Sequence, residues 1–139
     1  MKRLLFGSGV WPAGFGEIAL TALRVFAGLA LAFGHGMGKL PPSDGFVSGV
    51  AEMGFPMPEV FAWLASLAEF GGGLCLAIGL FTRPSAFFVA FTMAVAGLVR
   101  HAPDPFQKKE LALMYLFVAL VFMAIGGGRL AADRFLRNG

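Results

Sequence analysis

Four long, almost uninterrupted apolar stretches decide what this chain can fold into. They cover residues 17–38, 59–80, 84–100 and 110–126. Their lengths of roughly 17 to 22 residues are close to the ~20 that an α-helix needs to cross about 30 Å of hydrocarbon. Because the apolar residues are continuous and do not alternate at period two, a transmembrane β-barrel is excluded. The sequence predicts an all-α integral membrane protein, a bundle of four short transmembrane helices.

The composition also favours a membrane over a soluble protein. Hydrophobic residues make up 58% of the chain and charged residues 14%, whereas soluble domains have about 45–50% and about 25%. The net charge is +3, but the Lys and Arg residues are scattered near the ends of the apolar stretches. We therefore expect these residues to anchor the protein in the lipid bilayer, and we expect no nucleic-acid partner.

We predict one four-helix domain over residues 17–130, preceded by a lead at 1–16 that lies in the headgroup layer and followed by a tail at 131–139. Proline and glycine clusters separate the apolar stretches. With four spans, both termini share a side with six basic residues, against four on the other side. This bias predicts cytoplasmic termini, in the cytoplasmic membrane of a bacterium or archaeon.

Two charged residues lie inside the apolar stretches, Arg24 in the first and Glu69 in the second. A charged group in a membrane helix is costly unless it is paired or hydrated. We predict that antiparallel packing brings the two together, since they differ in depth by about one helical turn. The pair is either a structural brace or part of a proton path or ligand site, and the sequence leaves both open.

Helical periodicity places each charge on a stripe that faces the interior. Residues on one line of the first stretch are Glu17, Arg24, Gly28, Leu31 and His35. Residues on one line of the second are Ala62, Ser66, Glu69, Gly73 and Leu76. Small residues beside a charge favour close helix packing.

A further polar group is expected at one membrane level, where His35 and Lys39 end the first stretch, His101 follows the third and Glu110 begins the fourth. With Glu69 beneath them, these side chains could line a pocket for a small polar molecule or a quinone headgroup. The alternatives are ordinary interfacial anchoring and, for His35, a core histidine bonded to a carbonyl oxygen.

Other chemistry is poorly supported by the motifs. No pair of residues has the His-x-x-x-His or Glu-x-x-His spacing of a metal site, so we predict no metal. Cys75 is the single cysteine and is interpreted as an apolar filler. The glycine-rich run Gly34–Lys39 ends a span and does not join a strand to a helix, so it is no phosphate loop. We assign no catalytic residue.

The polar and glycine positions together resemble the DoxX family of small four-helix membrane proteins. The residues that carry the resemblance are Arg24, the run from Gly28 to Gly36, Lys39, Gly45-Phe46, Gly54-Phe55-Pro56, Glu69, Gly72-Gly73, Gly79-Leu80, Thr82-Arg83, Glu110 with Leu111 to Leu113, and Gly127 to Leu130. Two details differ from the family pattern: the tail has a glycine triplet and Ala131-Ala132-Asp133, and the third loop is compact.

The resemblance implies a membrane subunit linked to redox chemistry, because the family is named after a component of a thiosulfate:quinone oxidoreductase. Relatives are associated with oxidative stress. It makes Arg24, His35, Lys39, Glu69 and Glu110 the residues to follow. The partners it implies are soluble redox enzymes or a second membrane subunit, and the cofactor is a quinone.

Three functions follow as hypotheses. The preferred one is a redox-associated subunit that binds a quinone or a small sulfur or polar ligand inside the bundle. The second is a scaffold without chemistry of its own that recruits soluble redox enzymes. The third is a small transporter or channel, although the halves have no evident repeat. Phe87, Phe88 and Phe91 would suit association into a homo-oligomer.

Overall fold

The computed structural model describes residues 14–138, with side-chain surroundings through Leu136, and in this range the chain is helical without strands. The all-α prediction is confirmed. The lead predicted for residues 1–16 lies almost wholly outside the described residues.

Four long helical stretches make up the bundle, and three of them contain a π-helical segment. The first is α2 (Phe15–Leu31), continued by η1 (Ala32–Gly36) and a 3-10 turn η2 (Met37–Lys39). The second is α4 (Pro58–Leu67), η3 (Ala68–Gly72) and α5 (Gly73–Ile78). The third is α6 (Thr82–Ala94) and η4 (Val95–Arg100), and the fourth is α7 (Phe106–Ile125). Two short helices, α3 (Asp44–Glu52) and α8 (Asp133–Asn138), complete the described fold.

Three of the stretches are long and apolar enough to cross a membrane: Phe15–Lys39, Pro58–Ile78 and Thr82–Arg100. The fourth, α7, has 20 residues, but Lys108, Lys109 and Glu110 lie in its first turns. Its apolar part is therefore shorter than the ~20 residues of an ordinary span. All four stretches begin and end within four residues of the apolar stretches in the sequence.

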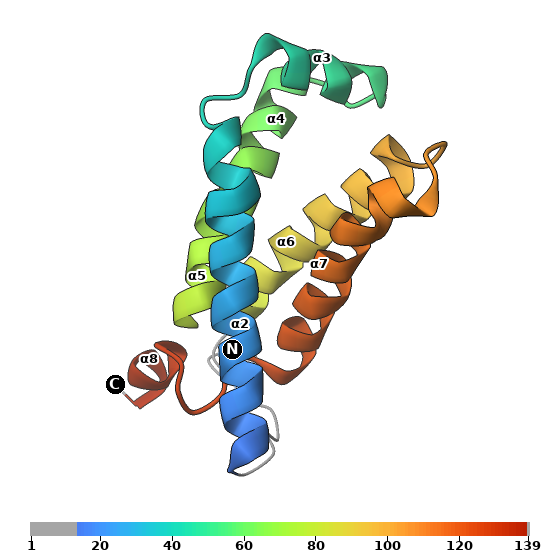
Figure 1. Cartoon of the computed structure of the whole chain (residues 1–139). Helices are drawn as coiled ribbons and strands as arrows, with labels where there is room; N and C mark the ends of the chain where they lie inside the picture. The colour runs from blue at the N-terminus through green and yellow to red at the C-terminus, as the bar shows by residue number, and fades with distance from the viewer. Residues whose placement is uncertain (1–13, 139) are drawn as a thin grey trace.

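The helices form two antiparallel pairs, with α2 packed along α5 and α6 packed along α7 (Figure 1). We call the two ends of the bundle the α3 end and the α8 end, after the short helix that lies at each. Toward the α3 end the pair α6 and α7 leans away from α2 and α4, and α3 lies across that end.

Glycine brings the first two spans into backbone contact. A Cβ atom added at Gly28 would lie 2.5 Å from the carbonyl oxygen of Gly73 and 2.6 Å from the amide nitrogen of Ala77. Since no side chain separates the helices here, their register is set by this contact. Small-residue contacts of this kind are the usual way in which membrane helices pack closely.

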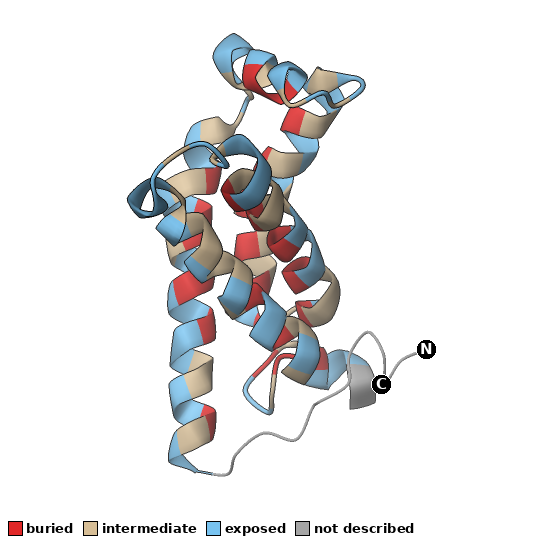
Figure 2. Cartoon of the chain, turned by 90° about the vertical axis from the view of Figure 1, so that its right-hand side faces the viewer, coloured by how far each residue is buried: buried red, intermediate tan, exposed pale blue. Residues whose placement is uncertain are grey.

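Burial in the bundle is the reverse of that in a soluble protein. Large apolar side chains such as Phe26, Phe33 and Phe117 are exposed, while Arg24 and Glu69 are almost fully buried. Figure 2 shows that exposed positions run along the outer faces of the helices and that buried positions lie between them. Exposed apolar surface on this scale requires an apolar solvent. The protein is integral to a membrane.

The α8 end is held by a carboxylate from the tail. Asp133 Oδ1 accepts a hydrogen bond from the amide of Phe81 at 2.7 Å, and its Oδ2 accepts one from Thr82 at 2.9 Å. These amides belong to the N-cap residue and the first residue of α6, where the helix dipole favours a negative charge. Asp133 therefore caps α6 from about 50 residues away in the sequence.

Replacing Asp133 with alanine is expected to lower the free energy of unfolding by about 1–2 kcal/mol, the usual cost of removing a helix N-cap. Asp133→Asn retains one acceptor oxygen and should lose less. Equilibrium unfolding in mixed detergent micelles measures both variants. Equal stability of Asp133→Ala and the unsubstituted protein would contradict the capping role.

Candidate functional site

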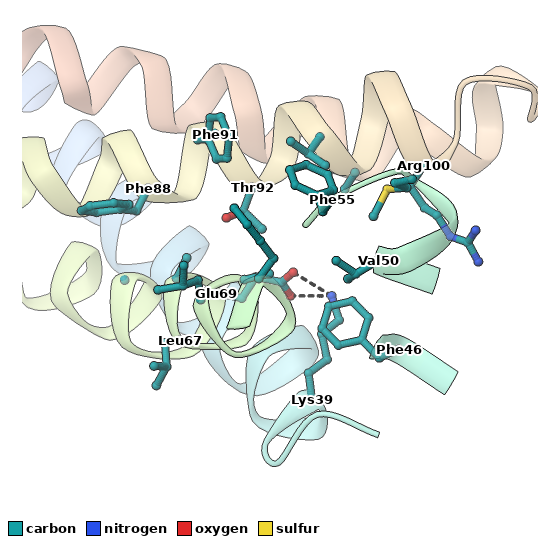
Figure 3. A pocket seen from close by; sticks show the side chains of 18 of the residues that line it. Lys39, Phe46, Val50, Phe55, Leu67, Glu69, Phe88, Phe91, Thr92 and Arg100 are labelled. Carbon is teal, nitrogen blue, oxygen red and sulfur yellow. Dashed lines mark hydrogen bonds and ion pairs between the residues drawn. The ribbon is translucent and has the colours of Figure 1, made fainter. Parts of the chain in front are cut away.

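A cavity of about 750 Å³ lies between the second and third spans and beneath α3 (Figure 3). Its walls come from α4, η3 and α5 on one side and from α6 and η4 on the other. Most of the lining is apolar and includes six phenylalanines: Phe46, Phe55, Phe61, Phe87, Phe88 and Phe91. A volume of this size is typical of pockets for small organic ligands.

An ion pair stands in the cavity wall. Lys39 Nζ donates to both oxygens of Glu69, at 2.7 and 2.8 Å. The Glu69 side chain is 2% exposed and that of Lys39 is 36% exposed. An ammonium group has three N–H donors, and the carboxylate takes two of them. One donor of Lys39 therefore remains for another acceptor, and Lys39 lines the cavity.

The local fold explains the position of both side chains. Glu69 lies in the π-helical segment η3, and Lys39 ends the 3-10 turn η2. Ser66, one turn before Glu69, donates its hydroxyl to the Lys39 carbonyl oxygen at 3.0 Å and so ties the two spans together. Single π turns inside α-helices occur frequently at functional sites.

Helix α3 forms the roof of the cavity. Ser43 caps its first turn, accepting from the Phe46 amide at 3.3 Å. From this helix Phe46, Gly49 and Val50 line the cavity. The Phe46 ring lies 5.4 Å from Lys39 Nζ, a distance at which a cation and an aromatic face attract each other.

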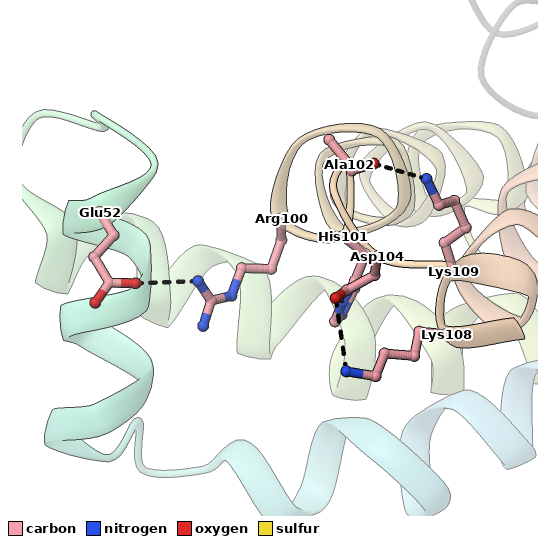
Figure 4. A network of polar contacts seen from close by, with 7 residues as sticks. All are labelled: Glu52, Arg100, His101, Ala102, Asp104, Lys108 and Lys109. Carbon is pink, nitrogen blue, oxygen red and sulfur yellow. Dashed lines mark hydrogen bonds and ion pairs between the residues drawn. The ribbon is translucent and has the colours of Figure 1, made fainter. Parts of the chain in front are cut away.

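Charged groups surround the cavity at the α3 end (Figure 4). Arg100 Nη1 lies 3.1 Å from Glu52 Oε2 and so links η4 to α3. His101 Nδ1 lies 2.7 Å from Asp104 Oδ2. The hydrogen bond with His101 is the main reason that the pKa of Asp104 lies below its ordinary value, and Lys108 lowers it further. Arg100 and His101 both line the cavity.

The predicted pairing of Arg24 with Glu69 is wrong. Arg24 donates to the carbonyl oxygens of Leu76 and Ala77, both at 2.8 Å, and of Leu130 at 3.1 Å. Glu69 lies beside Gly36 of the first span, about 12 residues or roughly 18 Å along the helix from Arg24. The close contact at Gly28 sets this register, and the sequence did not reveal it.

The other candidate residues divide between the cavity and the rest of the bundle. Lys39, Glu69 and His101 line the cavity. His35 does not: its ring packs edge-on against Tyr115 of α7, with centroids 5.8 Å apart. Glu110 is exposed in α7, and Arg24 is buried near the α8 end.

Some lining residues were missed or interpreted differently from the sequence. The connection after the first span was expected to be a loop, yet it contains α3. Cys75, interpreted as a filler, lines the cavity near its far end, as do Phe87 and Phe88. Ser43 followed by apolar residues at positions 46 and 50 is a helix signal that could have identified α3.

Within residues 14–138, no group of three or more His, Cys, Asp or Glu side chains is arranged so that it could hold a metal ion.

Comparison with known proteins identifies the family of this sequence. The sequence matches the DoxX family over residues 19–102, more than half of the chain. The protein belongs to the DoxX family. All residues that line the cavity fall between Lys39 and His101, so the cavity of this DoxX protein is built entirely from the matched region.

Individual relatives of this DoxX protein come from several bacteria. "Putative oxidoreductase CatD" of Bacillus subtilis (strain 168) is 28% identical over 124 residues, which cover 88% of this chain and 90% of that protein. An uncharacterized protein of Haemophilus influenzae is 34% identical over 107 residues, covering 71% and 77%. "Inner membrane protein YphA" of Escherichia coli (strain K12) is 34% identical over 70 residues, half of each chain. No solved structure matches.

Proposed function

We propose that this DoxX protein is a redox-associated membrane subunit that binds a quinone headgroup in the cavity beside Lys39 and Glu69. The observation that carries the proposal is an ammonium group, paired with a buried carboxylate, at the wall of an apolar cavity. A quinone headgroup is a flat apolar ring with two carbonyl acceptors. It needs an aromatic, water-poor site with a hydrogen-bond donor.

The two charged residues have different roles in this proposal. Lys39 donates to a quinone carbonyl oxygen. Glu69 is a positioning residue, because its two oxygens hold the Lys39 ammonium in place. Phe46 of α3 and Phe91 of α6 provide the apolar surface against which the ring packs.

The names of two relatives support the proposed redox role and the membrane location. The name of CatD contains the word oxidoreductase, and YphA is named as an inner membrane protein. We accordingly propose a bacterial cytoplasmic membrane as the location, and a soluble redox enzyme or a second membrane subunit as the partner that exchanges electrons with the bound quinone.

Titration of the purified protein with a decyl-chain benzoquinone tests the proposal. Lys39→Met is expected to weaken binding about tenfold or more, because a hydrogen bond to a charged group contributes about 1.5–3 kcal/mol. Since this change leaves Glu69 buried without its partner, the double variant Lys39→Met with Glu69→Gln is measured alongside it and should bind equally weakly. Lys109→Met and His35→Ala, both outside the cavity, serve as controls and should leave the Kd within about twofold.

Two results would contradict this function. One is the absence of saturable binding to the unsubstituted protein. The other is a Kd that changes as much in Lys109→Met as in Lys39→Met.

A further inference from the structure

The cavity continues past the ion pair toward the α8 end. We call this part the inner groove, lined by Gly72 and Cys75 of the second span and Ser85, Phe87 and Phe88 of the third. Its one hydroxyl group, that of Ser85, donates to the Leu80 carbonyl oxygen at 3.4 Å. The inner groove is therefore mostly apolar and carries no charged group.

The inner groove opens sideways between the two spans. Leu67, Phe87, Phe88 and Phe91 line the cavity, yet they are 50%, 52%, 58% and 53% exposed. In Figure 3, Leu67 and Phe88 lie on one side of Glu69, and Phe46 and Arg100 lie on the other. The two exposed walls belong to the spans Pro58–Ile78 and Thr82–Arg100, so the medium beside them is the hydrocarbon of the bilayer.

The α3 end of the cavity, unlike the inner groove, is covered by a helix and carries charged groups. There α3 lies over the cavity, and the ion pair between Arg100 and Glu52 joins α3 to η4 (Figure 4). The Lys39 ammonium lies under the Phe46 ring at the same end. Polar groups thus gather at one end, and an apolar, laterally open groove leads away from them.

We infer that the ligand reaches this cavity from within the bilayer and carries a long apolar chain, which lies in the inner groove while its headgroup binds at Lys39 and Glu69. This inference rests on the proposed function and specifies its ligand: a membrane-dissolved quinone with a long alkyl or polyprenyl chain. The polar end of the cavity matches the headgroup, and the apolar side opening at hydrocarbon depth matches the chain.

Photolabelling in lipid nanodiscs tests where the chain lies. The probe is a benzoquinone with a decyl chain that ends in a diazirine, and the labelled peptides are mapped by mass spectrometry. We expect labels within residues 67–75 and 85–91 that disappear when excess decyl benzoquinone competes. Labels confined to the outer face of α2 or to α7, and still removed by the competitor, would overturn the inference while leaving the proposed function intact.

A groove-filling variant provides the second measurement. Cys75→Phe adds a ring to the inner groove and is expected to lower competed labelling about tenfold, while the Kd of the same benzoquinone without a chain stays within about twofold. Ala22→Phe, which adds the same ring to an exposed position of α2, should change neither value. Phe88→Ala, which removes one wall without adding bulk, should lower labelling of residues 85–91 even if Cys75→Phe does not fold.

The outcomes separate the two proposals. Undiminished labelling in both groove variants overturns the inference about the chain. If neither quinone binds saturably to the unsubstituted protein, the proposed function itself fails.

Discussion

Replacing Arg24 with alanine is expected to destabilise the bundle by about 3 kcal/mol. The guanidinium is 1% exposed and donates to three carbonyl oxygens, those of Leu76, Ala77 and Leu130. Leaving a buried acceptor unsatisfied costs about 1–3 kcal/mol, but hydrogen bonds between membrane helices average only about 0.6 kcal/mol. The Leu76 oxygen also accepts from the Gly79 amide at 3.2 Å, so we expect about 1 kcal/mol for each of the three lost hydrogen bonds and not the full cost of three unsatisfied acceptors.

Equilibrium unfolding in mixed micelles, with increasing dodecyl sulfate, measures this loss. Arg83→Ala is the matched control, because Arg83 makes one exposed bond, to the Ala124 carbonyl oxygen at 3.1 Å, and its loss should cost less than about 1 kcal/mol. Arg24→Lys keeps the charge without the fork of donors and should fall between the two. Equal losses in Arg24→Ala and Arg83→Ala would show that the buried bonds do not stabilise the fold.

The second large effect is expected from one added methyl group. In Gly28→Ala the new Cβ would lie 2.5 Å from the Gly73 carbonyl oxygen and 2.8 Å from the Ala77 Cβ. Backbone atoms cannot turn aside as a side chain can, so the two spans must separate. We expect a loss of about 3 kcal/mol or more, at the upper end of the cost of overpacking.

Substitution of glycine by alanine six residues later, at Gly34, is expected to raise the free energy of unfolding. A Cβ at Gly34 would meet nothing within 4 Å, and alanine is favoured over glycine inside a helix by about 0.5–1 kcal/mol. Gly34→Ala is therefore the control for Gly28→Ala, measured by the same unfolding assay. A similar loss in both variants would contradict the prediction, because it would show that the contact with Gly73 does not determine the result.

Much of the fold follows from short-range patterns in the sequence. The lengths of the apolar stretches give the helices, and Gly79 and Gly126, with φ of 73° and 76°, end α5 and α7 as expected of glycine. The helical stripe of the second span was also correct. Its five residues Ala62, Ser66, Glu69, Gly73 and Leu76 are all buried.

The stripe of the first span was correct only as far as the helix remains α-helical. Glu17, Arg24, Gly28 and Leu31 are buried in α2, but His35 lies in the π-helical segment η1 and is only partly buried. A π turn changes the number of residues per turn, so a period of 3.6 residues no longer predicts which side a residue faces. The prediction that His35 lies on the buried stripe depended on that period, whereas its place in the pocket was predicted from its depth in the membrane.

The partners of the buried charges could not be predicted for a different reason. They depend on how far one span is shifted along the other, and this shift is set by backbone contact at Gly28 and Gly73. A sequence contains many glycines in apolar helices, and nothing local distinguishes the pair that touches. The role of α3 was hidden likewise, because Pro41, Pro42 and Gly45 are strong loop signals beside a short amphipathic pattern.

We expect the two ends of the bundle to differ in stiffness, because the tail is attached at only one of them. At the α8 end, Arg24 and Asp133 join the first, second and third spans to residues 130–133 through buried hydrogen bonds. At the α3 end the helices are joined across the cavity by an exposed ion pair, and π turns interrupt three of them. We therefore expect the cavity to widen at the α3 end, with the helices pivoting about the tail. A ligand could then enter while the α8 end of the bundle stays closed.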